Sequence, residues 1–114
     1  LFNYLDEILY LDTDLIVKNN LSDVFNTNLE KNLFLGGSIG KNGPSKESIG
    51  NVNVGCLILN LKQQRIENTE VELINFIINN KVQEEQAINS FYFDRILYTN
   101  KFYFISKRQK KNII

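Results

Sequence analysis

The chain has a single cysteine, a single proline and no histidine among its 114 residues. Cys56 cannot form a disulfide within the chain, and its place in the apolar run VGCLILNL predicts a buried thiol that packs as a small hydrophobe. No apolar stretch reaches the length of a membrane-spanning helix, so we expect no membrane span in this segment. The length allows one domain at most.

An excess of either charge is also missing, because thirteen basic and thirteen acidic residues cancel. This balance gives no reason to expect a nucleic acid or an anionic membrane as partner. The distribution is uneven, since four basic residues lie within the last eight positions. Residues 1–105 carry nine basic and thirteen acidic residues, a net charge of −4, which favours an attraction for cations.

Short apolar runs alternate with helical patterns along the chain and predict an α/β fold, with a mixed, mostly parallel sheet and flanking helices. Five of the six glycines and the only proline lie in 36–50, which predicts a mobile loop. Thr69 and Glu72 have the spacing of a capping box. The predicted strands are 7–11, 33–35, 52–61 and two segments within 95–104, with 15–17 extended; the predicted helices are 22–25, 70–80 and one from about 83 to 91.

Two aspartates directly follow the first predicted strand, in the tripeptide Asp12-Thr13-Asp14. Carboxylates one residue apart beyond a buried strand are able to face one hard divalent cation, which prefers oxygen ligands. A polar turn explains the same residues without a metal. The tripeptide alone leaves both interpretations open.

Two further groups of polar residues are candidate site residues. Asn53 and Gly55 interrupt the start of the predicted strand 52–61, where the glycine indicates a bulge or a close backbone approach. Asn53 has an alternative role in pairing with loop backbone. Glu84 and Glu85 begin a predicted helix, where the helix dipole favours acidic residues without any substrate.

These segments together resemble glycosyltransferase family 8, which includes glycogenin and lipopolysaccharide galactosyltransferases. The residues that carry the resemblance are EILYLDTDLIVKNNLSDVF at 7–25, NVGCLILNL at 53–61 and EEQAIN at 84–89, within a similarity over about 4–104. The resemblance implies part of a GT-A fold. It also implies that 1–114 is the central part of one catalytic domain, without the N-terminal nucleotide-binding strands and the C-terminal histidine-containing segment, and inactive by itself.

The function implied by this resemblance is retaining transfer of a hexose from a UDP-sugar to a glycan, lipopolysaccharide or protein acceptor. Asp12 and Asp14 would hold Mn²⁺ or Mg²⁺. Asp12, Asn53, Gly55 and Glu84 would contact the donor, and Glu84 and Glu85 would be the catalytic residues. One shared site requires the strands that end at 11 and begin near 52 to be neighbours, with the helix N-terminus near 83 at the same edge.

Several positions depart from the family pattern. Val54 replaces a serine, Glu84 replaces an aspartate and Glu85 replaces a glutamine, and the chain has no histidine to serve as the third protein ligand of the metal. A degenerate or truncated binding module without catalysis is therefore an alternative. A haloacid-dehalogenase-type phosphatase also carries Asp-x-Asp after a strand, but Leu15 and Ile16 follow here instead of Gly-Thr.

Overall fold

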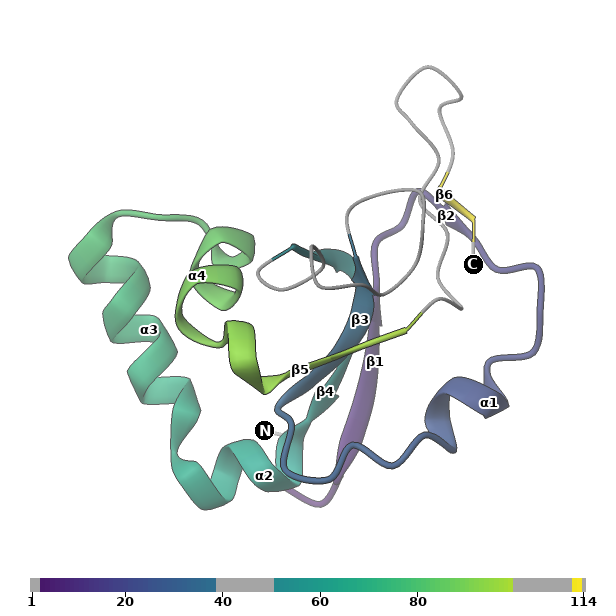
Figure 1. The fold of residues 1–114 in the computed structure, drawn as a ribbon, viewed down its shortest axis with the longest axis horizontal. Coiled ribbons are helices and arrows are strands. Elements are labelled where there is room, and N and C mark those ends of the chain that lie inside the picture. The colour runs from purple at the N-terminus through teal and green to yellow at the C-terminus, as the bar shows by residue number, and fades with distance from the viewer. Residues whose placement is uncertain (1–2, 39–50, 100–111, 114) are drawn as a thin grey trace.

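The computed structural model describes residues 3–38, 51–99 and 112–113 (Figure 1). No helix within this part of the chain is long and apolar enough to cross a membrane. In chain order the elements are β1 (Glu7–Leu11), β2 (Leu15–Ile16), α1 (Ser22–Phe25), β3 (Phe34–Ser38), β4 (Val52–Asn60), α2 (Leu61–Glu67), α3 (Thr69–Asn80), α4 (Glu84–Phe91), the 3-10 turn η2 (Phe93–Arg95), β5 (Ile96–Tyr98) and β6 (Asn112–Ile113).

The main sheet has four strands in the order β1-β4-β3-β5. It is mixed and flanked by helices, as predicted, and three of its four strands, β1, β3 and β5, run in the same direction. β4 runs antiparallel to both β1 and β3, and only β3 and β5 are parallel neighbours. An apolar run buried on both faces has the same composition in either direction, so the sequence pattern did not distinguish them. β2 and β6 form a separate parallel pair.

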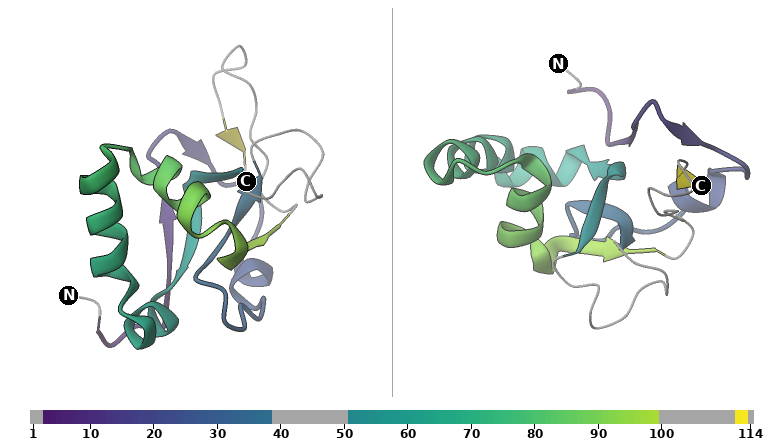
Figure 2. Two further views of the ribbon diagram at one scale, coloured as in Figure 1. Left: turned by 60° about the vertical axis from the view of Figure 1, so that its left-hand side comes forward. Right: turned by 90° about the horizontal axis from the view of Figure 1, so that it is seen from above.

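Both faces of the sheet carry an apolar cluster, and helices cover both (Figure 2). Val24 of α1 packs on one face against Leu35, Cys56 and Ile58. The other face packs under α4, with Leu73 of α3 beside it. Its buried residues are Leu33, Phe34, Val52, Leu57, Ile88, Tyr92 and Ile96.

The strand β4 changes faces partway along its length. Leu57 and Leu59 pack in the cluster under α4, as alternation requires, but so do Val52 and Val54. Between them the pairing with β3 is irregular, because Gly36 pairs with Leu57 whereas Ser38 already pairs with Val52. Residues 53–56 thus lie opposite Gly37 alone. This irregularity agrees with the bulge expected near Gly55, since an odd number of extra residues, here three, reverses the alternation of side chains.

The ends of α2 and α3 depend on asparagines. Asn60 caps α2 by accepting the N–H of Gln63 at 3.2 Å, so the strand predicted to reach 61 ends one residue earlier. The capping box predicted at Thr69 does not form, because the helix already begins at that residue. Its N-cap is Asn68, in the left-handed conformation with φ 55°. Asparagine tolerates this conformation better than most residues.

The predicted loop 36–50 begins later than expected. Residues 36–38 belong to β3, and 39–50 lie outside the described residues. A Cβ on Gly36 would lie 2.5 Å from Val52 Cγ2 and 2.9 Å from Leu57 Cδ1, so the close packing of β3 on β4 explains this glycine. The first strand predicted within 95–104 is β5, and 100–104 also lie outside the described part.

Candidate functional site

Asp12 lies at the end of β1, beside the irregular segment of β4. Its N–H donates to the carbonyl oxygen of Gly55 at 2.8 Å, which continues the ladder between the two strands. Its carboxylate then lies over Gly55, where a Cβ would be 2.6 Å from Asp12 Oδ2. The glycine therefore permits the close approach that its place in the sequence indicated, and the approaching group is a carboxylate.

Asn53 lies beside the same glycine. Its Oδ1 accepts the N–H of Gly55 at 2.8 Å and would be 3.0 Å from a Cβ there. The interpretation that Asn53 pairs with nearby backbone is therefore correct for its amide oxygen. This bond also holds the side chain next to the carboxylate of Asp12, so two polar groups from neighbouring strands meet above one glycine.

Tyr10 is a residue of this site that the sequence reasoning missed. Its hydroxyl donates to Asp12 Oδ1 at 2.9 Å, and the side chain is 51% exposed. The pKa of Tyr10 is raised, chiefly by the hydrogen bond to Asp12 and then by the charge of Asp12, with smaller effects of burial and of the Glu84 charge. The sequence contained a signal for this contact, because Tyr10 and Asp12 are two positions apart and side chains at this spacing in extended chain share a face.

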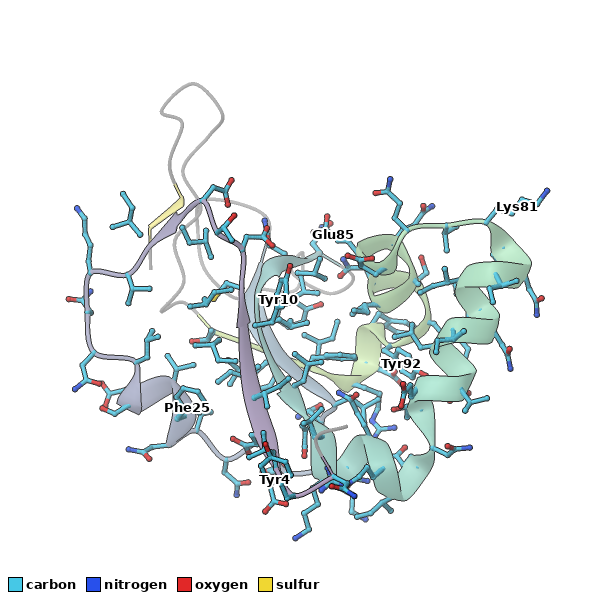
Figure 3. The ribbon with its side chains drawn as sticks, turned by 180° about the vertical axis from the view of Figure 1, so that it is seen from behind. Tyr4, Tyr10, Phe25, Lys81, Glu85 and Tyr92 are labelled. Atoms are coloured by element: carbon cyan, nitrogen blue, oxygen red, sulfur yellow. The ribbon has the colours of Figure 1, made fainter. Side chains whose placement is uncertain are left out.

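The N-terminus of α4 faces this end of the sheet. Glu85 Oε2 accepts the N–H of Val54 at 3.2 Å. Glu84 is exposed and near enough for its charge to raise the pKa of Tyr10. Figure 3 shows Tyr10 on β1 and Glu85 on α4 in the upper half of the molecule, away from Tyr4. The helix dipole alone therefore does not account for Glu85, because its carboxylate also accepts a hydrogen bond from the backbone of β4.

Asp14 is exposed in the turn between β1 and β2. Among residues 3–38, 51–99 and 112–113 no group of three or more His, Cys, Asp or Glu side chains could hold a metal ion. Asp12 and Asp14 still supply hard oxygen donors two positions apart. Such a pair fits Mg²⁺ or a similar cation, which proteins often hold through one or two carboxylates together with substrate phosphates.

Cys56 follows this segment and takes no part in its chemistry. The thiol is fully buried, as predicted, and burial, with a further contribution from the charge of Asp12, raises its pKa to about 12. A thiol with this pKa stays protonated near neutral pH. Because the thiolate is the form that binds metals and attacks substrates, Cys56 is core packing.

The two strands expected to be neighbours are adjacent, since Leu11 of β1 pairs with Cys56 of β4. They run antiparallel, so the polar residues lie after the end of β1 and at the beginning of β4. The structure brings together Asp12, Asn53 and Gly55. Glu85 lies beside them, because its carboxylate accepts the N–H of Val54, the residue between Asn53 and Gly55.

No protein-family model matches the sequence, and no curated protein matches it. Several solved structures are similar to this one. The glycosyltransferase GlyE of Streptococcus pneumoniae TIGR4 is 27% identical with a TM-score of 0.67, over 84% of this chain and 24% of that chain. The galactosyltransferase LgtC, in complex with donor and acceptor sugar analogues, is 24% identical with a TM-score of 0.71, over 92% and 43%. The bifunctional glycosyltransferase WbbM is 19% identical with a TM-score of 0.68, over 86% and 22%.

The chain therefore has a glycosyltransferase-like fold of the GT-A type. It spans less than half of the length of each of these neighbours, between 22% and 43%.

Proposed function

We propose that this chain is the central part of the catalytic domain of a retaining glycosyltransferase, which moves a hexose from a UDP-sugar to a glycan, lipopolysaccharide or protein acceptor. The observation that carries the proposal is the meeting of the Asp12 carboxylate and the Asn53 amide oxygen over Gly55. The similarity to the complex of LgtC with donor and acceptor sugar analogues supports it. If Asp12 only formed a polar turn, no glycine would be required next to its carboxylate.

Asp12 and Asp14 would hold a Mn²⁺ or Mg²⁺ ion, whose chemistry is to neutralise the negative charge that builds on a departing diphosphate. The hydrogen bond from Tyr10 orients one oxygen of Asp12. The other oxygen lies over Gly55, at the surface of the site. Asp14 is exposed in the turn that follows Asp12, directly before β2.

The remaining residues would position the donor sugar. Asn53 and Glu84 offer hydrogen bonds to sugar hydroxyls, and Gly55 permits a close approach. Glu85 is held through one oxygen by Val54, which leaves its second oxygen for the reacting carbon, as a nucleophile or as a group that stabilises positive charge there.

The test is metal-dependent turnover by the complete gene product that contains this chain. We expect release of UDP from UDP-glucose or UDP-galactose only with Mn²⁺ or Mg²⁺, and an Asp14→Asn variant should lose at least about 100-fold in kcat/KM because a ligand charge is lost. Asp23→Asn removes an exposed carboxylate on α1 and is the matched control, which should retain activity. Unchanged turnover in Asp14→Asn would contradict the proposed metal role.

A non-catalytic binding module is the second candidate, because within the described residues no third carboxylate, thiol or imidazole joins Asp12 and Asp14 in a metal site. Absence of turnover with all UDP-hexoses, combined with Mn²⁺-dependent binding of one of them, would favour this candidate. Absence of both binding and turnover would exclude the donor site in either form.

A further inference from the structure

Asn89, on the second turn of α4, makes three hydrogen bonds, two of which join the helix to β4. Its Oδ1 accepts the N–H of Val52 at 2.7 Å, and its Nδ2 donates to the carbonyl oxygen of Val52 at 2.9 Å. Nδ2 also donates to the carbonyl oxygen of Glu85 at 3.0 Å, one helical turn earlier. The side-chain amide thus binds both backbone groups of one strand residue, as a neighbouring strand does elsewhere in the sheet.

These bonds lie where the regular pairing of β4 is interrupted. On the side of β3, residues 53–56 lie opposite Gly37 alone. Val54 donates its N–H to the carboxylate of Glu85. Asn89 and Glu85 therefore attach α4 to β4 at Val52 and Val54, on either side of Asn53. Buried or half-buried backbone groups that lose their bonding partner are costly, so both attachments resist displacement.

We infer that Asn89 is a positioning residue, which sets the distance between the carboxylates at the N-terminus of α4 and the Asp12–Asn53–Gly55 group. This inference rests on the proposed function for its consequence in catalysis. The placement of α4 by Asn89 does not depend on the proposed function, because the same hydrogen bonds predict which backbone amides exchange faster when Asn89 is replaced. Asn89 does not need to touch the substrate, since it acts through Val52 and Glu85.

The structural test is amide hydrogen exchange, measured by NMR on the 114-residue chain and on Asn89→Leu. We expect the amides of Val52 and Val54 to exchange at least about tenfold faster, while those of Leu57 and Ile58 in the same strand change little. Val54 is decisive because Glu85, and not Asn89, is its acceptor. Faster exchange at Val54 means that the helix has moved.

Asn80 provides a matched control, because its Nδ2 donates to the carbonyl of Phe76, four residues earlier on α3, at 2.9 Å. Asn80→Leu removes the same kind of bond without touching β4, and should leave Val52 and Val54 unchanged. If Asn89→Leu does not fold, Asn89→Asp keeps the acceptor for Val52 but loses both donated bonds. In that variant Val52 N–H should stay protected while Val54 N–H exchanges faster.

Two results would overturn the inference: exchange accelerated at Val52 but not at Val54, or exchange accelerated equally throughout the chain. In the complete gene product, Asn89→Asp should lower kcat for UDP-hexose at least about tenfold with a smaller change in KM, since the donor contacts of Asp12 and Asn53 remain. Asn80→Asp should change neither constant. If the unmodified protein turns over no UDP-hexose, the proposed function fails, and the exchange rates still decide whether Asn89 positions α4.

Discussion

The two halves of β4 are held in different ways. Residues 57–59 pair with β1 on one side and β3 on the other, whereas 52–55 lie beyond the last paired residue of β1 and opposite an irregularity in β3. In the second region the side chains of Asn53, Glu85 and Asn89 bind the backbone. Where strands pair regularly, the core is apolar. Where pairing is interrupted, polar side chains must satisfy the backbone, and they collect in one place.

The largest expected effect lies in the regular half. Ile58 is fully buried, so Ile58→Ala should lower the free energy of unfolding by about 2 to 5 kcal/mol through lost burial and a cavity. Denaturation by urea measures this change. Ile66→Ala is the matched control, because Ile66 is 68% exposed and its truncation should cost less than about 1 kcal/mol. Equal costs at both positions would show that the regular half is not the stable core.

Two glycines at the boundary between these regions give a sharper comparison. A Cβ on Gly36 meets side chains of the core, so Gly36→Ala should cost about 1 to 3 kcal/mol. A Cβ on Gly55 meets the ends of Asp12 and Asn53, which can turn away. Gly55→Ala should therefore cost less stability than Gly36→Ala but displace the carboxylate of Asp12.

Paramagnetic broadening of NMR signals by Mn²⁺ separates the two variants. We expect Mn²⁺ to broaden the amide signals of Asp12 and Asp14 in the unmodified chain and in Gly36→Ala. In Gly55→Ala the broadening should be at least about tenfold weaker, because groups that orient a metal ligand affect metal affinity by about this factor. Equal broadening in both glycine variants would mean that the position of the Asp12 carboxylate does not affect the cation.

The smallest effect concerns pH, at the opposite end of the sheet from Asp12. Glu67 accepts a hydrogen bond from Arg95 Nη1 at 2.7 Å and another from Gln63 at 2.6 Å, and these contacts, that of Arg95 foremost, lower its pKa to about 2. A lowered folded-state pKa contributes stability above the ordinary value near 4.5, and this contribution is lost as the pH falls toward 2.

The loss should be at most about 1 kcal/mol, because the pair is partly exposed and solvent screens it. Urea denaturation between pH 6 and pH 3 measures it as a difference between the unmodified chain and Glu67→Gln. Arg95→Gln removes the same pair and should reduce the pH dependence similarly. A pH dependence unaltered by either substitution would show that the pair contributes no net stability.

The sequence by itself determined the elements whose causes are local. The apolar run from Glu7 to Leu11 formed the predicted strand with the same bounds, and the helical period before Asn80 formed α3. The burial of Cys56 followed from its apolar neighbours. The glycine at 55 indicated a close approach because only a residue without a Cβ fits one. Asp12 lay at a strand end because a polar residue after an apolar run ends a buried strand.

Only the tertiary structure decided the direction of the strands, the change of face within β4 and the identity of the groups that meet. Strand direction depends on pairings between residues far apart in the chain, such as Leu11 with Cys56, and a local pattern does not encode them. The role of Asn89 depends likewise on Val52, which lies 37 positions away in sequence. Tyr10 belongs to the site through its hydrogen bond to Asp12, which lies two positions further along the extended chain. Local propensity acts over a few residues, whereas the site is assembled from backbone groups that packing leaves without a strand partner.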